Sequence, residues 1–201
     1  MESLLTEQIE ALSLVETIAV LAAVLYLVLA IRRNIWCWFF AGVSTAIYVV
    51  LFIDARLYME SMLNVFYFAM AIYGWYFWYT GSGAAPPPII RWPFRNHAIA
   101  IVVIAALSLL FGYLLERHTD AVFPYIDSLT TFAAIWATFL VARKVLENWW
   151  YWLVIDSVSI FIYWARELPM TALLFAVYVV MIPFGLVAWT RAMHEQTASQ
   201  P

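Results

Sequence analysis

Charged side chains are scarce in this sequence, and their scarcity excludes a soluble protein. Only 11% of the 201 residues are charged and 66% are hydrophobic, whereas a soluble domain has about a quarter charged and about half apolar residues. A soluble chain of this composition would expose apolar patches far larger than solubility allows. We therefore expect an integral membrane protein. Since the net charge is only -3 and no basic patch is present, we expect no nucleic-acid partner.

Cysteine, lysine and histidine are also scarce, and each scarcity excludes a class of site. Cys37 is the only cysteine, which excludes an internal disulfide and a thiolate metal cluster. Lys144 is the only lysine and falls in a polar break between apolar segments, which argues against a retinal Schiff base buried in a helix bundle. The three histidines are too scattered along the chain to form a metal site.

The sequence lacks the motifs of the common enzyme classes. It has no Gly-rich loop that would cradle phosphates and no nucleophile–base pair at membrane depth. We therefore expect no enzyme activity, no catalytic residues, no bound metal and no cofactor. The acidic N-terminus differs from the basic start of a cleaved signal peptide, so we expect the first helix to stay in the membrane.

Long apolar segments dominate the rest of the chain, and seven of them approach the roughly 20 residues that span a bilayer. This predicts an all-α polytopic membrane protein with seven transmembrane helices in one domain, residues 13–190. An extracytoplasmic N-terminus, 1–12, and a cytoplasmic tail, 191–201, flank it. The predicted spans are 13–31, 35–53, 57–79, 97–115, 127–142, 147–164 and 170–190.

Arginine and lysine are distributed unequally between the two sets of loops, which predicts the orientation. With the N-terminus outside, the cytoplasmic segments hold seven basic residues and the outer loops hold three. Because cytoplasmic loops carry the excess of Lys and Arg, we predict an outer N-terminus and a cytoplasmic C-terminus. The seven are Arg32, Arg33, Arg91, Arg95, Arg143, Lys144 and Arg191, and the three are Arg56, Arg117 and Arg166.

An internal repeat relates the third apolar segment to the seventh. The run A-R-L-Y-M-E-S-M-L, from Ala55, resembles A-R-E-L-P-M-T-A-L-L, from Ala165, after one inserted residue. The upstream helices also match loosely, with N-I-W-C-W at 34–38 set against N-W-W-Y-W at 148–152. The identities that continue the first match pair Met59 with Met170, Tyr67 with Tyr178, Met70 with Met181, Gly74 with Gly185 and Trp78 with Trp189.

The repeat predicts a 3+1+3 arrangement of the helices. Repeat one would cover about 13–79, a linker helix about 97–115 and repeat two about 127–190. An odd linker helix gives both halves the same orientation, which is a parallel repeat. Transporters are often built in this way, with the substrate site near mid-membrane between the halves.

Asp156 is a carboxylate that this pattern places deep in a predicted helix. It lies nine residues after Glu147, about 13 Å along a helix at about 1.5 Å per residue. That depth is close to the middle of a hydrocarbon layer about 30 Å thick. A carboxylate there is costly and usually faces a cavity, a partner or a transport pathway. The alternative is a structural hydrogen bond to a neighbouring helix.

A stripe of aromatic and polar residues on the same helix includes this carboxylate. Trp149, Trp152 and Asp156 fall within about 60° of one another on a helix, and Ser159 and Tyr163 continue the stripe. Because indole faces and carboxylates both attract cations, this face suits a flat, positively charged aromatic ligand with hydroxyl groups. The alternative for the two tryptophans is an interfacial aromatic belt.

The third predicted helix carries a comparable stripe, which includes Asn64, Tyr67 and Gly74. Asn64 lies about 10 Å in from the outer end of the helix, where an amide can bind a substrate or hold two helices together. Trp150 and Tyr151, by contrast, point away from the stripe of their own helix. We expect those two rings to face lipid or neighbouring helices.

Two motifs in these helices match a known family. Residues 142–160 read A-R-K-V-L-E-N-W-W-Y-W-L-V-I-D-S-V-S-I and contain W-x-x-W-x-x-x-N/D at Trp149, Trp152 and Asp156. Residues 63–78 read L-N-V-F-Y-F-A-M-A-I-Y-G-W-Y-F-W. Both resemble the signatures of PnuC-type vitamin transporters, whose best-known members carry nicotinamide riboside. The resemblance covers nearly the whole apolar core.

The resemblance implies a fold and a mode of action. The fold would be the seven-helix 3+1+3 arrangement of the sugar-transporting SWEET proteins. The activity would be facilitated diffusion of an unphosphorylated vitamin, which a cytoplasmic kinase then traps by adding a phosphate. Thr138 marks a departure, because many family members have glutamine at this point before the A-R-K run. Thr138 would then change how a ribose or a carboxamide is held.

We therefore predict a bacterial inner-membrane uniporter that imports nicotinamide riboside for pyridine nucleotide synthesis. Trp149 and Trp152 would flank the ring and Asp156 would meet its positive charge or the ribose hydroxyls, while Asn64 and Tyr67 would complete the site. The partners would be the vitamin, the lipid bilayer and the kinase, and a homo-oligomer is left open.

Three alternatives stay open at the level of sequence. The substrate could be another vitamin or nucleoside, such as thiamine or riboflavin. Transport could be coupled to protons through Asp156. The protein could also be a membrane sensor or scaffold that supports no flux.

Overall fold

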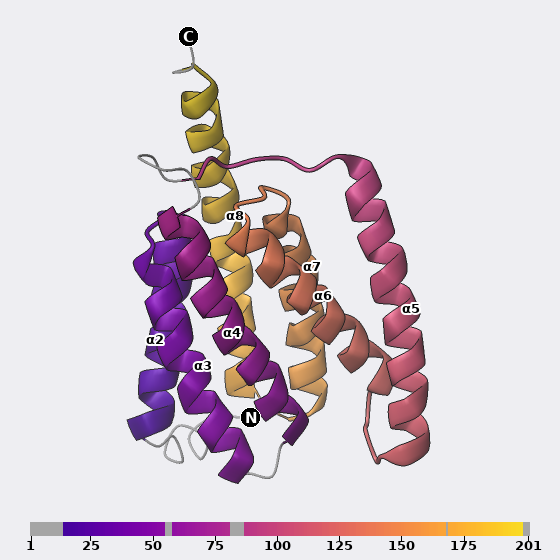
Figure 1. Ribbon diagram of the computed structural model, residues 1–201. Coiled ribbons are helices and arrows are strands. Elements are labelled where there is room, and N and C mark those ends of the chain that lie inside the picture. Colours follow the sequence, from indigo (N-terminus) through magenta and orange to yellow (C-terminus); the bar gives the residue numbers. More distant parts are fainter. Residues whose placement is uncertain (1–13, 55–57, 81–86, 168, 199–201) are drawn as a thin grey trace. The chain divides into compact units, whose positions relative to one another are not determined.

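The computed structural model describes residues 14–54, 58–80, 87–167 and 169–198, and this part of the chain is helical throughout its regular elements (Figure 1). Seven helices occur in it, as predicted, and most of their ends lie within three residues of the predicted ones. The helices are α2 Leu14–Ile31, α3 Trp36–Asp54, α4 Tyr58–Thr80, α5 Phe94–His118, α6 Pro124–Ala142, α7 Asn148–Ala165 and α8 Pro169–Ala198.

Prolines explain where two helices begin. Pro93 has an extended backbone, with φ -65° and ψ 146°, and α5 starts directly after it. Pro124 is the first residue of α6, a position where the missing N–H costs no hydrogen bond. Both helices therefore start three residues earlier than their apolar runs suggest. At the other end of the chain, α8 continues to Ala198, so the tail predicted from residue 191 is largely helical.

Three helices in the described part of the chain are long and apolar enough to cross a membrane: Phe94–His118, Pro124–Ala142 and Thr171–Ala198. Two shorter apolar helices are Thr17–Ile31 and Trp36–Leu51. The count is lower than the seven predicted spans. The remaining helices, α4 and α7, carry many tyrosine and tryptophan rings, which are amphipathic and lower the mean hydropathy of a segment.

The chain divides into two compact units. The first comprises Met1–Ile89, Val141–Lys144 and Phe184–Pro201. The second comprises Ile90–Leu140 and Val145–Pro183. Helix α8 contributes residues to both units and has Pro183 inside it.

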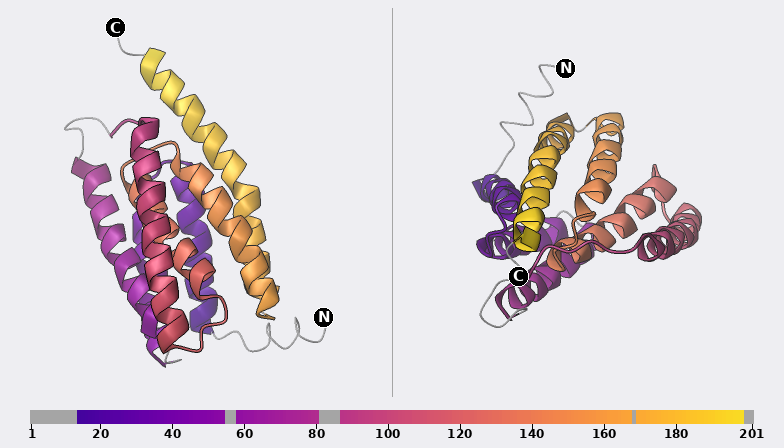
Figure 2. Two further views of the ribbon diagram at one scale, coloured as in Figure 1. Left: turned by 90° about the vertical axis from the view of Figure 1, so that its right-hand side faces the viewer. Right: turned by 90° about the horizontal axis from the view of Figure 1, so that it is seen from above.

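In the first unit, α2, α3 and α4 lie side by side (Figures 1 and 2). The Ser44 hydroxyl of α3 donates to the Ala19 carbonyl of α2 at 2.9 Å. Gly74 lets α3 and α4 approach closely, because a Cβ atom there would lie 2.3 Å from the Trp38 ring. This close approach puts the buried ring of Trp38 directly against α4.

In the second unit, α5 packs through a stripe of small residues. Ala100, Ser108 and Gly112 are among its buried residues, whereas large side chains such as Val102 and Leu109 are 68% and 64% exposed. A Cβ atom at Gly112 would lie 2.9 Å from the Tyr125 Cα of α6. The buried stripe therefore contacts α6, and the opposite face of α5 presents apolar side chains outward.

The turns that follow α2 and α6 have the same backbone geometry. Arg33 and Lys144 both have positive φ, 58° and 53°. The next amides, of Asn34 and Val145, each donate at 2.9 Å to the carbonyl five residues earlier. This is the Schellman pattern of a helix C-terminus. Most non-glycine residues avoid positive φ. Its presence in both turns therefore indicates that α2 and α6 end in the same way.

This geometry favours another register for one sequence match. When the two turns are superposed, residues 34–38 are matched with 145–149. The same register matches Trp78 with Trp189. This register differs by three residues from the pairing of 34–38 with 148–152, in which the tryptophans are identical. In the register of the turns, Trp38 is matched with Trp149, and each is 2% exposed.

Candidate functional site

The stripe predicted on α7 lies on the buried side of that helix. Trp149, Asp156 and Ser159 are 2%, 4% and 5% exposed. The opposite side carries apolar side chains that are at least half exposed, as expected for a face toward lipid: Trp150, Val154, Phe161 and Trp164. Trp150 thus points outward, as predicted, and α7 presents its carboxylate and hydroxyl to the protein interior.

Asp156 has no protein partner among the residues that the structure describes. Within the described ranges, its carboxyl group makes no hydrogen bond and no ion pair, although the side chain is almost fully buried. A buried carboxyl without a partner is costly, and buried polar groups of this kind are uncommon in native proteins. The structural alternative, a hydrogen bond to a neighbouring helix, has no counterpart in the described residues. A ligand or a proton would supply the missing partner.

Two further predicted residues of this unit lie at different depths. The Trp152 ring is half-buried, so it is more accessible than the Trp149 ring. Thr138 is 7% exposed on α6, and its hydroxyl donates to the Ala134 carbonyl at 2.8 Å. That bond uses the hydroxyl proton, which leaves the Thr138 oxygen available as an acceptor.

Asn64 and Tyr67 lie on α4, in the first unit, and both are half-buried. They are one turn apart, so they share a face of α4. Ala71 continues this face and is 3% exposed. The other five candidate residues, Trp149, Trp152, Asp156, Ser159 and Thr138, lie in the second unit.

Asn148, the first residue of α7, is a buried polar residue that the sequence did not single out. Its side chain is completely buried, and its Nδ2 donates to the Val145 carbonyl at 2.7 Å. Its Oδ1 is buried without a hydrogen-bond partner in the described part of the chain. The amide next to Trp149 therefore fixes the turn before α7 and keeps an unused acceptor.

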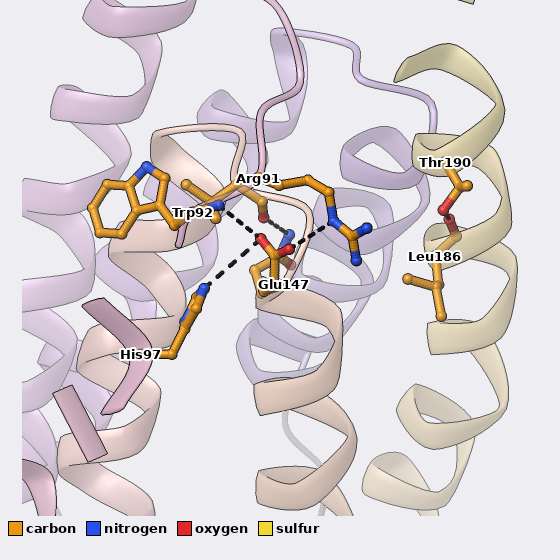
Figure 3. Close-up of polar contacts among 8 residues, drawn as sticks. Arg91, Trp92, His97, Glu147, Leu186 and Thr190 are labelled. Atoms are coloured by element: carbon orange, nitrogen blue, oxygen red, sulfur yellow. Dashed lines mark hydrogen bonds and ion pairs between the residues drawn. The ribbon is translucent and has the colours of Figure 1, made fainter. Parts of the chain in front are cut away.

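A polar cluster around Glu147 anchors the beginning of α7 (Figure 3). Glu147 accepts a hydrogen bond from Arg91 Nε at 2.9 Å and one from the Trp92 backbone N–H at 3.3 Å. His97 Nε2 lies 3.9 Å from the same carboxylate, and His97 Nδ1 lies 3.1 Å from the Tyr151 hydroxyl. Tyr151 therefore faces α5, which agrees with the prediction that it meets lipid or a neighbouring helix.

No local pattern in the sequence indicates this cluster, since the partners of Glu147 come from the segment around the start of α5. That segment also joins the α6–α7 turn through its backbone. The Leu146 N–H donates to the Ile90 carbonyl at 2.9 Å, and Ile90 and Val145 form an isolated parallel bridge. These bonds position the start of the helix that carries Asp156.

Lys144 is buried, although it lies in a loop. Its side chain is 4% exposed, its Nζ donates to the Pro87 carbonyl at 3.1 Å, and the same atom lies 4.4 Å from the centre of the Trp78 ring. Burial, reinforced by the nearby Arg33 guanidinium, lowers the pKa of Lys144 to about 8. The ring and the carbonyl thus hold an ammonium group that has little water around it.

Asp127, in the first turn of α6, is paired. It accepts a hydrogen bond from Arg166, the residue that follows α7. Both side chains are about 30% exposed, so the pair joins two helix ends at a partly solvated position.

Comparison with known proteins assigns the family. The family model described as "Nicotinamide mononucleotide transporter" matches residues 13–191. The nicotinamide riboside transporter PnuC of Escherichia coli (strain K12) is 26% identical over 92% of this chain and 88% of its own length. The riboflavin/roseoflavin transporter RibM of Streptomyces davaonensis is 26% identical over 81% of this chain and 78% of its own length.

A solved structure also resembles this fold. The crystal structure of the vitamin B3 transporter PnuC superposes with a TM-score of 0.72, covering 90% of this chain and 82% of that one, at 19% identity. The family match covers helices α2 to α7 and α8 as far as Arg191. The chain therefore belongs to the nicotinamide mononucleotide transporter family, as its aromatic motifs predicted, and it is a membrane transporter and not an enzyme.

Proposed function

We propose that this protein imports nicotinamide riboside by facilitated diffusion and that Asp156 receives the positive charge of the substrate. The observation that carries the proposal is the buried Asp156 carboxyl, which has no protein partner in the described part of the chain. A carboxylate inside a membrane protein usually marks a substrate or ion pathway. The nicotinamide ring of nicotinamide riboside carries a permanent positive charge, which would supply the missing partner.

The other residues predicted for the site suit the rest of the same molecule. Trp152, whose ring is half-buried, would lie against the cationic ring. Ser159 and Thr138 offer oxygen atoms for the ribose or the carboxamide. Trp149 would line the inner end of the site, and we propose that Asn64 and Tyr67 contact the substrate from the other repeat.

We infer that the chain is arranged as a 3+1+3 parallel repeat, with α5 as the linker helix. Two observations support this: the equivalent Schellman turns after α2 and α6, and the single register that relates these turns and also pairs Trp78 with Trp189. With the N-terminus outside and the C-terminus in the cytoplasm, rocking of the repeats would expose the site to each side in turn. A cytoplasmic kinase would then retain the vitamin by phosphorylation.

Other vitamins are alternative substrates. RibM is a riboflavin and roseoflavin transporter by name, and thiamine is another cationic aromatic vitamin. Asp156 favours the cations, because riboflavin carries no positive charge that would compensate the carboxylate. Proton coupling is the alternative in which the missing partner of Asp156 is a proton.

A binding panel tests the proposal. Purified protein is heated with nicotinamide riboside, thiamine, riboflavin or an uncharged nucleoside, and the unfolding midpoint is recorded. A ligand at about 100 times its Kd stabilises a native site by about 2.7 kcal/mol, so we expect the largest shift with nicotinamide riboside. Trp152→Ala and Asp156→Ala should remain folded and lose the shift. Wild-type shifts in both variants would refute this site.

A further inference from the structure

Two tryptophans in the first unit hold the ends of two helices through their indole N–H groups. Trp78 Nε1 donates to the Ala142 carbonyl at 3.0 Å, and Trp189 Nε1 donates to the Ala30 carbonyl at 3.0 Å. Both acceptors lie in the last turn of a helix, α6 in one case and α2 in the other. We call these two bonds the indole clasps.

The indole clasps are reciprocal between the two proposed repeats. Trp78, at the end of α4, belongs to the first repeat and binds a carbonyl of the second. Trp189, on α8, belongs to the second repeat and binds a carbonyl of the first. Trp78 and Trp189 are matched in the register that relates the two Schellman turns. Ala30 and Ala142 are one position away from a match in the same register. Donors and acceptors therefore occupy corresponding places in the repeats.

Both clasps are shielded from water. Trp189 and Ala142 are 0% exposed, Ala30 is 2% and Trp78 is 4% exposed. The two indole rings lie 6.4 Å apart, and Trp38 packs edge-on against Trp78 at 5.6 Å. Each carbonyl is buried against an aromatic ring. The Ala30 carbonyl also accepts the Arg33 N–H at 3.0 Å and would keep that bond if its clasp opened, whereas the Ala142 carbonyl would need water in place of the indole, because the last carbonyls of a helix have no N–H partner within it.

The basic residues that follow the acceptors place this region at the predicted cytoplasmic end. Arg32 and Arg33 come directly after α2, and Arg143 and Lys144 come directly after α6. Lys144 also packs on the Trp78 ring. A bond across the repeats at this end would have to break whenever the repeats separate there.

We propose that Trp78 and Trp189 form the cytoplasmic gate of this transporter: the indole clasps close when this end is shut and open together when substrate leaves. The inference rests on the proposed transport function and on its repeat arrangement. It assigns a positioning role to two residues that do not belong to the proposed substrate site. It also explains why the repeat match retains a tryptophan at both places.

The only cysteine of the chain supplies a native reporter of this opening. Cys37 is completely buried on α3 and directly precedes Trp38, which packs on Trp78. A small maleimide can reach the thiol only when this end of the first unit opens. The labelling rate of Cys37 by N-ethylmaleimide, measured by mass spectrometry without substrate, therefore reports the population of the open gate.

The experiment compares wild type with Trp78→Phe, Trp189→Phe and the double variant. Phenylalanine keeps a ring and removes the N–H donor, and a buried hydrogen bond has a net effect of about two- to tenfold on an equilibrium. Each single variant should raise the Cys37 labelling rate by that factor, and the double variant by more. Trp150→Phe, at a ring that is 52% exposed, is the matched control and should label at the wild-type rate.

Unchanged labelling in the single and double variants, at an unchanged unfolding midpoint, would overturn the gate. Substrate binding is measured separately on the same samples, so a protein without transport function still gives an informative labelling result. If a phenylalanine variant fails to fold, hydrogen exchange in the wild type tests whether the two clasps open together. The equivalent amides of Asn34 and Val145 should exchange in step, and clearly different rates at the two amides would contradict a joint opening.

Discussion

Asp156 and Lys144 are opposite cases of a charged residue inside this protein. Lys144 has a carbonyl and an aromatic ring as neighbours, whereas Asp156 has no partner in the described part of the chain. An ammonium group that has partners can be a structural element, but a buried carboxyl without any calls for a ligand or a proton. The two residues therefore lead to different kinds of experiment.

Replacing Asp156 by asparagine should change selectivity more than it changes folding. The amide keeps the size of the side chain and one acceptor oxygen, but it replaces the second oxygen by an NH2 donor and loses the negative charge. We expect the preference for nicotinamide riboside over an uncharged nucleoside to fall by at least about tenfold, which corresponds to about 1.4 kcal/mol. Competition binding on the purified variant measures this ratio, and an unchanged ratio would show that Asp156 does not meet the positive charge.

Lys144 should make stability rise at alkaline pH. Its pKa is about 8 in the folded protein and 10.5 in the unfolded reference. Between these values the unfolded chain binds more protons, so stability increases with pH across this window. The full shift corresponds to at most about 3 kcal/mol, less the part that solvent screens. Thermal unfolding of wild type and of Lys144→Met across this pH window checks the prediction. The rise in stability should be smaller in the variant, and equal pH profiles of the two proteins would contradict the role of Lys144.

At the scale of helices, much of the arrangement could be predicted because the polar breaks are short and sharp. The pairs Arg32–Arg33 and Arg143–Lys144 mark the ends of α2 and α6 to within a residue. The starts of α5 and α6 were missed by three residues, since a proline at a helix start looks like a loop residue in an apolar scan. The extension of α8 was missed because residues 191–198 are polar, and polarity alone does not end a helix.

The packing of α3 against α4 depends on a glycine, and a neighbouring glycine offers the control. A methyl group at Gly74 would meet the Trp38 ring at 2.3 Å, whereas one at Gly42 would meet only ordinary contacts at 3.8 and 4.0 Å. Gly74→Ala should therefore destabilise the protein by about 1–3 kcal/mol. Gly42→Ala should be neutral or stabilising by up to about 1 kcal/mol, because alanine is the better helix former.

Chemical denaturation of both glycine variants in the same detergent measures these differences. If Gly74→Ala is as stable as Gly42→Ala, α3 and α4 do not pack through the Trp38 ring. The contrast between the two sites is the informative quantity, since both glycines lie on the same pair of helices.

At the scale of the whole molecule, the sequence predicted the family and the polar face of α7 but not the bonds that hold distant segments together. The motif around Trp152 and Asp156 is local, and helical periodicity is enough to place both on one stripe. The contacts of Glu147 with Arg91 and of Trp78 with Ala142 join residues 56 and 64 positions apart. Nothing in the local pattern distinguishes these side chains from ordinary loop charges or interfacial tryptophans.

Transport into liposomes tests the central claim most directly. Purified protein is placed in sealed liposomes, and the entry of nicotinamide riboside is followed with and without a protonophore. We expect saturable entry that stops at equal concentrations inside and outside and that the protonophore does not change. Asp156→Ala should abolish this entry, and Trp150→Phe should retain it. Entry no faster than in protein-free liposomes, or uptake that requires a pH gradient, would contradict the proposed uniporter.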